Sequence, residues 1–105
     1  MLKEFEDKNW ETEIKEETVT ICQMSDHWCT PCQSLKVVME KLSDEYKDRA
    51  NFYYGDVEEG AINTASASGI RGVPSTICWK KGVEVDRLVG NPGEAKVREF
   101  LDKNI

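Results

Sequence analysis

The chain has 105 residues, with 20 Asp and Glu against 14 Lys and Arg, and its formal net charge is −6. An acidic surface without a basic cluster repels phosphate backbones, which argues against a nucleic-acid partner. The sequence has no basic-then-apolar leader and no apolar run near the roughly 18 residues of a membrane span, so we expect one cytoplasmic domain, residues 1–105, with no membrane partner.

The first half of the chain alternates between strand and helix patterns. Residues 2–5 predict a short edge strand, and Trp10 and Ile14 share one face of a brief amphipathic helix. The apolar, β-branched run 19–24 is typical of an interior strand covered on both faces. The apolar period then changes, and the spacing predicts a long helix from Thr30 to about Asp48. The apolar stripe of this helix consists of Leu35, Val38, Met39, Leu42 and Tyr46.

The second half continues this alternation and closes with a hairpin and a helix. Residues 51–54 predict a second interior strand, and residues 61–68 predict a weak short helix. Two strand patterns, 75–80 and 83–89, flank a Lys-Gly dipeptide, which is a hairpin signal. A last helix begins near Gly93.

The predicted order is therefore β α β α β α β β α. Strands joined through helices lie parallel, whereas the two strands of the hairpin are antiparallel. The fold class that we expect is α/β, with a mixed central sheet of about five strands flanked by four helices on both faces.

Two cysteines, Cys29 and Cys32, stand two residues apart, and such a pair can bind metal, crosslink the fold or act as a redox couple. Zinc prefers four N or S ligands, but Cys22 and Cys78 are isolated in strand patterns and His27 is the sole histidine, so we predict no metal. A purely structural crosslink is disfavoured because a four-residue loop constrains the unfolded chain very little. We expect Cys22 and Cys78 to be core residues, with a regulatory thiol as the alternative.

The redox reading gives each position a physical reason. Cys29 would lie at the first turn of the long helix, where unpaired N–H groups and the positive dipole end favour thiolate, the attacking species in disulfide exchange. Cys32, nearly one turn further on, can reach Cys29 and act as the resolving thiol. Pro31 fits the first turn and stiffens the loop, and Trp28 would cover the site with an apolar face. His27 is expected to be a surface residue, or else a positive charge that further favours the thiolate.

Three segments together resemble the thioredoxin family: W28-C-T-P-C32, G69-I-R-G-V-P-S75 and V89-G90, in that family's order and spacing. The resemblance covers essentially the whole chain. It implies a thioredoxin fold and a thiol–disulfide oxidoreductase that reduces protein disulfides, with Cys29 as the nucleophile, Cys32 as the resolving thiol and a Cys29–Cys32 disulfide in the oxidised state. No cofactor is required in the chain itself.

The resemblance also implies a substrate site. The proline that matches Pro74 is cis in thioredoxins and packs against the active-site sulfurs. An extended substrate peptide could pair with the backbone of Val73. The residues that would rim this shallow groove are Trp28, Gly72, Val73, Pro74, Val89, Gly90 and Asn91.

Two of the departures from the family pattern bear directly on the redox chemistry. Thr30 stands where thioredoxins usually have glycine, which predicts a stiffer loop and a redox potential shifted in an unknown direction. Gln23 aligns with the buried aspartate that exchanges a proton with the resolving cysteine, and an amide cannot ionise. We therefore predict that the resolving step relies on water or on Asp26.

The expected partners are disulfide-containing target proteins and a thioredoxin reductase, which could be NADPH-, ferredoxin- or flavin-linked. We expect a monomer that serves electron transport and cell redox homeostasis. One alternative is a glutaredoxin-like reductant, disfavoured because Thr30 and Pro31 stand where glutaredoxins typically have Pro-Tyr. The other alternative is a binding subunit of a larger assembly, in which the cysteines are incidental.

Overall fold

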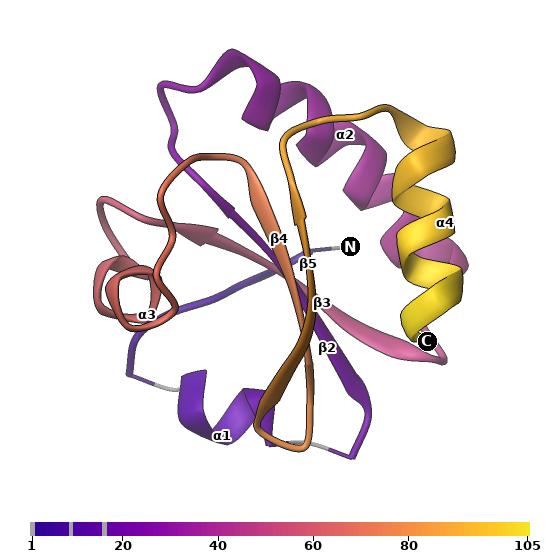
Figure 1. Ribbon diagram of the computed structural model, residues 1–105, viewed down its shortest axis with the longest axis horizontal. Coiled ribbons are helices and arrows are strands. Elements are labelled where there is room, and N and C mark those ends of the chain that lie inside the picture. Colours follow the sequence, from indigo (N-terminus) through magenta and orange to yellow (C-terminus); the bar gives the residue numbers. More distant parts are fainter. Residues whose placement is uncertain (1, 9, 16) are drawn as a thin grey trace.

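The computed structural model describes residues 2–8, 10–15 and 17–105, and it places the elements in the predicted order (Figure 1). The strands are β1 (Lys3–Glu4), β2 (Val19–Ser25), β3 (Ala50–Asp56), β4 (Ser75–Lys80) and β5 (Val83–Val89). The helices are α1 (Trp10–Ile14), α2 (Thr30–Glu45), α3 (Ile62–Ala67) and α4 (Glu94–Asn104).

The strands of the described chain form one mixed sheet in the order β1-β3-β2-β4-β5. β1 and β2 both pair parallel to β3, whereas β4 pairs antiparallel to β2 and to β5. The turn between β4 and β5 has positive φ at both Lys81 (52°) and Gly82 (87°), the combination that a type I′ hairpin turn needs. The predicted fold class and hairpin are confirmed.

Two boundaries differ from the sequence prediction by two residues or more. α2 ends at Glu45 rather than near Asp48, because Tyr46 leaves the helical region (φ −107°, ψ 11°) while its N–H still bonds to the Leu42 carbonyl. β3 runs on to Asp56 instead of stopping at residue 54, because its parallel pairing with β2 continues through Ser25. The polar end of β3 is thereby carried to the place where β2 ends.

Helices cover both faces of the sheet, α2 and α4 on one side and α1 and α3 on the other (Figure 1). Alternating strand residues fill the two layers: Ile21 packs with Leu35 and Leu101 beneath α2 and α4, whereas Cys22 packs with Phe5 in the opposite layer. Cys22 and Cys78 are fully buried and take no part in the disulfide, which confirms the prediction that they are core residues.

α3 depends on a residue far away in the sequence. The Asp7 carboxylate accepts hydrogen bonds from the backbone N–H groups of Asn63 (2.9 Å) and Thr64 (2.7 Å) and from the Thr64 hydroxyl (2.7 Å). α3 has no side-chain cap of its own at Ala61, so Asp7 satisfies the open donors of its first turn.

Across the described residues, no helix has both the length and the apolar character needed to cross a bilayer.

Candidate active site

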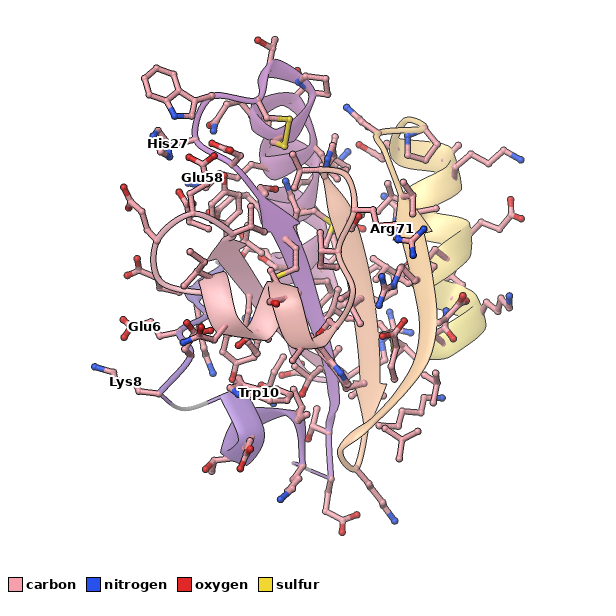
Figure 2. The ribbon with its side chains drawn as sticks, turned by 60° about the vertical axis from the view of Figure 1, so that its left-hand side comes forward. Glu6, Lys8, Trp10, His27, Glu58 and Arg71 are labelled. Carbon is pink, nitrogen blue, oxygen red and sulfur yellow. A yellow bond between two sulfur atoms is a disulfide. The ribbon has the colours of Figure 1, made fainter. Side chains whose placement is uncertain are left out.

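The Cys29–Cys32 pair lies where β2 gives way to α2, at one end of the molecule (Figure 2). Cys29 is the N-cap of α2: its backbone is extended (φ −87°, ψ 111°) and its Sγ accepts the backbone N–H of Cys32 at 3.1 Å. Thr30 and Pro31 form the exposed first turn, where the missing N–H of proline costs nothing. The local sequence thus directs the backbone N–H of Cys32, in the first turn of α2, at the Sγ of Cys29.

The two sulfurs are joined in a disulfide, with 5.1 Å between the Cα atoms. Cys29 is partly exposed, whereas Cys32 is fully buried. An incoming thiol or disulfide can therefore meet Cys29 but not Cys32. This difference in access matches the roles that the sequence predicts for the two residues.

A second loop closes over the pair. The Val73–Pro74 peptide bond is cis, and the Val73 carbonyl oxygen lies 3.9 Å from Cys29 Sγ. The Ser75 hydroxyl donates to the Gly72 carbonyl at 2.6 Å, and the Gly90 N–H donates to the Pro74 carbonyl at 2.8 Å. These bonds tie the segment after β5 to the proline loop, so the structure brings both predicted groove segments to the disulfide.

Exposed apolar surface flanks this arrangement. The Trp28 side chain is 78% exposed and Val89 is 67% exposed. Asn91 is exposed too, and its side-chain oxygen accepts the Gly93 N–H at 3.2 Å, which shapes the start of α4. In the part of the chain that the structure describes, neither backbone group of Val73 makes a backbone hydrogen bond. The Val73 carbonyl oxygen lies against Cys29 Sγ at 3.9 Å, and the pairing of an extended peptide with this backbone stays a prediction.

Gln23 lies under the pair rather than beside it. The side chain is fully buried on β2, and its Nε2 donates to the Cys32 carbonyl at 2.9 Å and to the Ser25 hydroxyl at 2.8 Å. The amide therefore links the strand to the first turn of α2. This contact supports the sequence-based assignment of Gln23 to the site.

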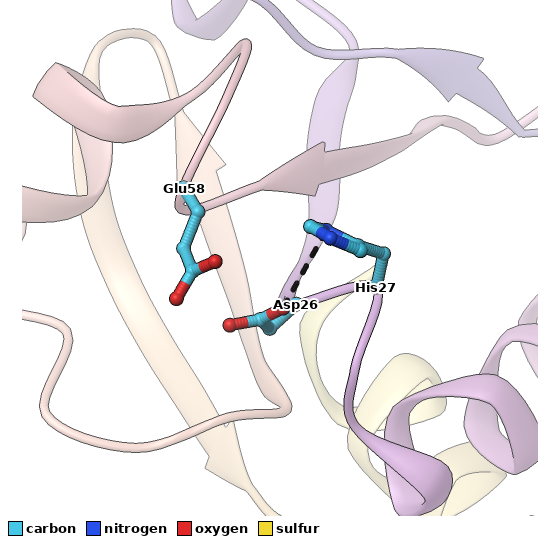
Figure 3. Close-up of side chains that lie close together, drawn as sticks. All are labelled: Asp26, His27 and Glu58. Carbon is cyan, nitrogen blue, oxygen red and sulfur yellow. Dashed lines mark ion pairs between the residues drawn. The ribbon is translucent and has the colours of Figure 1, made fainter.

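Asp26 belongs to a rim of charged side chains near Trp28, which consists of Asp26, His27, Asp56, Glu58 and Glu59. Its carboxylate accepts the Trp28 backbone N–H at 3.0 Å and lies 3.6 Å from His27 Nδ1, the ion pair marked in Figure 3. These contacts fix the loop that leads into Cys29. A part for Asp26 in the resolving step stays a prediction.

His27 is paired with a residue that the sequence did not single out, Asp56 at the end of β3. Its Nδ1 lies 3.1 Å from Asp56 Oδ2, and this hydrogen bond raises the pKa of His27 above its ordinary value. The Glu58 carboxyl extends toward Asp26 (Figure 3), and its hydrogen bond with Asp26 raises the pKa of Glu58. His27 also packs against the Trp28 ring, with centroids 4.8 Å apart.

Two groups of side chains on this rim carry atoms of the kinds that bind divalent cations. In each group these atoms lie within 4.8 Å of one another: one group is Asp26, His27 and Glu58, and the other is His27, Asp56 and Glu59. Exposed acidic groups often gather in this way without an ion. The prediction that the site holds no metal stays a prediction. The Asp26 and Asp56 carboxylates place negative charge close to His27 and Trp28.

The site has an accessible sulfur at a helix N-terminus, a disulfide to a buried partner sulfur, and a cis-proline loop beside them. This arrangement defines a thiol–disulfide oxidoreductase. Comparison with known proteins agrees with this class. The Thioredoxin family model matches residues 1–103. The chain belongs to the thioredoxin family.

Curated relatives match most of the chain. A thioredoxin of Chlorobaculum thiosulfatiphilum is 33% identical over 103 residues, which cover 97% of this chain and 94% of the relative. Thioredoxin C-2 of Corynebacterium nephridii is 31% identical over 100 residues, covering 94% and 92%. Thioredoxin M4, chloroplastic, of Arabidopsis thaliana is 32% identical over 94% of this chain, which spans only 49% of that relative.

A solved structure agrees as well. The crystal structure of Malassezia sympodialis thioredoxin (Mala s 13) superposes with a TM-score of 0.90 at 25% sequence identity, covering 99% of this chain and 90% of that one. These findings favour the oxidoreductase over the glutaredoxin-like and binding-subunit alternatives.

Proposed function

We propose that this chain works as a reductant of protein disulfides, with Cys29 as the attacking and Cys32 as the resolving residue. The observation that carries the proposal is the pairing of an accessible sulfur, which accepts the Cys32 N–H, with a buried one. A positively polarised helix end stabilises negative charge on Cys29, and burial keeps Cys32 from attacking or being attacked by outside partners.

The exchange proceeds in two steps. The Cys29 thiolate attacks one sulfur of the target disulfide, a Cys29–target disulfide forms, and the other target sulfur leaves as a thiolate that takes up a proton. Cys32 then loses its proton and attacks Cys29 Sγ, which releases the second target thiolate and leaves the Cys29–Cys32 disulfide. Two electrons pass to the target, and a reductase must return them.

The target is held as an extended segment along the open backbone of Val73, between Trp28 and the loop of Gly90. Truncation tests this groove: Trp28→Ala should lower kcat/KM for a protein disulfide several-fold, while the free energy of unfolding changes by less than about 0.5 kcal/mol, since the ring is largely exposed. Val37→Ala, an equally exposed apolar truncation on α2, is the matched control.

The thiol roles are tested by trapping. After prior reduction, Cys32→Ser should accumulate a mixed disulfide with insulin in its disulfide form. Cys29→Ser should trap nothing, and Cys78→Ser should turn over normally. A double variant, Cys29→Ser with Cys32→Ser, should lose all reduction of insulin. Mixed disulfides formed through Cys32 in place of Cys29 would contradict the assignment.

The electron donor is identified by recycling. NADPH-linked, ferredoxin-linked and flavin-linked thioredoxin reductases are each offered the oxidised protein, and the one that sustains insulin reduction is the partner. Turnover with glutathione alone would point to a glutaredoxin-like cycle instead. We expect the protein to be a monomer that works in the cytoplasm, in electron transport and redox homeostasis. The two buried cysteines that form no disulfide, Cys22 and Cys78, are compatible with a reducing compartment.

A further inference from the structure

Gln23 and Thr76 are direct partners across the antiparallel pairing of β2 and β4. Both side chains are fully buried. Gln23 is two residues from Ile21 on β2, and Thr76 is two residues from Cys78 on β4, so each shares a face of the sheet with that neighbour. Ile21 and Cys78 belong to the layer beneath α2 and α4, and the pair therefore lies on the face that these helices cover. Side chains directly opposite on one face have Cβ atoms roughly 5 Å apart. An uncharged polar pair is therefore built into the core on the Cys32 side of the sheet.

This pair has unused hydrogen-bonding capacity. The Cys32 carbonyl can only accept, so the amide nitrogen of Gln23 must face it and the orientation of the amide is fixed. Among the described residues, Gln23 Oε1 and Thr76 Oγ1 have no hydrogen-bond partner, although both are buried. Such groups are costly to leave unpaired, and each one in a native protein needs an explanation.

Reduction of the disulfide adds a new hydrogen-bonding group to Cys32, the residue whose carbonyl Gln23 already contacts. In the oxidised protein Cys32 Sγ is bonded to sulfur and carries no hydrogen. Two glutathione thiols convert the Cys29–Cys32 disulfide into two protein thiols and one glutathione disulfide, which balances electrons and protons. A thiol is both a donor and an acceptor, so one new group can satisfy an acceptor and a hydroxyl donor together.

We propose that Gln23 and Thr76 form a buried receptor for the reduced Cys32 thiol, in which Cys32 S–H donates to Gln23 Oε1 and the Thr76 hydroxyl donates to Cys32 Sγ. The inference rests on the proposed function, because it assumes that Cys32 cycles between disulfide and thiol. Gln23 and Thr76 are positioning residues. Their hydrogen bonds exist only in the reduced form, so they bias the couple toward the dithiol.

The Thr76 hydroxyl gives the cleaner test, because Gln23 also supports the Cys32 carbonyl. The variants are Thr76→Val, which removes the hydroxyl at nearly constant shape, and Thr76→Ser, which keeps it. Equilibration with glutathione buffers gives the ratio of dithiol to disulfide. We expect Thr76→Val to lower this ratio roughly three- to tenfold, the size of one net hydrogen bond, and Thr76→Ser to stay within about twofold of the wild type.

Ile21→Val is the control for a general loss of packing. It lies on the same strand and face as Gln23 and should destabilise both redox forms equally, leaving the ratio unchanged. An unchanged ratio in Thr76→Val, or equal shifts in Thr76→Val and Thr76→Ser, overturns the inference while leaving the proposed function intact. Failure of the wild type to cycle between dithiol and disulfide in any thiol redox buffer, dithiothreitol included, would overturn the proposed function and this inference together.

Infrared spectroscopy gives a second readout that a structural role would not move. The S–H stretching band of Cys32 is isolated by subtracting the spectrum of the Cys29→Ser, Cys32→Ser double variant from that of Cys29→Ser. A hydrogen-bonded thiol absorbs at a lower wavenumber than a free one. We expect the lowered band, and a band at the free-thiol position would overturn the inference.

Discussion

His27 and Asp56 are joined across the ends of neighbouring strands, with Nδ1 of His27 3.1 Å from Oδ2 of Asp56. The chain has one histidine, so its titration can be followed without ambiguity. The pair lies next to Trp28 and therefore sets the charge at the mouth of the site.

The first prediction concerns this titration. The hydrogen bond to Asp56 raises the pKa of His27 above 6.5, although burial opposes it. NMR titration of the ring should show a raised pKa in the wild type and a value nearer 6.5 in Asp56→Asn, with Asp48→Asn as an exposed control. A raised pKa in the folded state means that the pair stabilises the protein fully below pH 6.5 and that this contribution is lost as pH rises through the folded pKa. An unmoved titration in Asp56→Asn would contradict the assigned cause.

The second prediction separates the four thiols by reactivity. Burial raises the pKa of Cys78 to about 11, and Cys22 is fully buried. In the reduced native protein at neutral pH, iodoacetamide should therefore modify Cys29 at least tenfold faster than a free thiol of ordinary pKa, and leave Cys22 and Cys78 untouched until the chain unfolds. Peptide mapping by mass spectrometry gives each rate. Cys29 reacting no faster than free cysteine would remove the basis of the proposed mechanism.

Local patterns were sufficient to predict the elements and the reactive turn. The period change near Thr30 and the Cys-Thr-Pro-Cys spacing are encoded within a few residues, so they can be read without tertiary information. Resemblance to a family then added the loop around Pro74, which lies more than 40 residues from Cys29 and has no local sign of its destination.

Two of the contacts that sequence reasoning missed depend on strand register. Asp56 reaches His27 only because the pairing of β3 with β2 continues to the last pair, Asp56 with Ser25. This pair lies two residues beyond the end that the sequence predicts for β3. Thr76 faces Gln23 only through the particular antiparallel alignment of β4. A one-residue slip would turn either side chain to the other face, and no short segment specifies that alignment.

The third prediction tests the cap that joins the first loop to α3. Burial raises the pKa of Asp7, but the hydrogen bonds from Asn63 and Thr64 outweigh it and lower the pKa below its ordinary value of 3.8. Asp7→Ala should lower the free energy of unfolding by about 1 kcal/mol, the usual size of a lost cap. Because the folded pKa is depressed, the contribution is present above pH 3.8 and is lost as pH falls through the folded pKa. Chemical denaturation at pH 7 and at a descending series of pH values below 3.8 measures both effects, and a difference between variant and wild type that does not shrink along this series would contradict the charge-based cap.

The fourth prediction concerns Gly55, which is buried on β3 opposite Met24. A Cβ at this position would lie 3.1 Å from Ala61 Cβ, 3.1 Å from Met24 Sδ and 3.5 Å from Cys22 Sγ. The Met24 sulfur can shift, but Ala61 Cβ is anchored to its backbone, so Gly55→Ala should lower the free energy of unfolding by about 1–3 kcal/mol through overpacking.

Gly60→Ala is the matched control, since its new Cβ would meet only ordinary contacts, 3.6 Å to the Phe5 carbonyl and 3.7 Å to Glu6. Urea denaturation of both variants gives the comparison. Gly55 also precedes Asp56, so a displaced strand end would separate Asp56 from His27 and return the His27 pKa toward 6.5. A Gly55→Ala protein as stable as Gly60→Ala would contradict the overpacking that the contact distances at Gly55 predict.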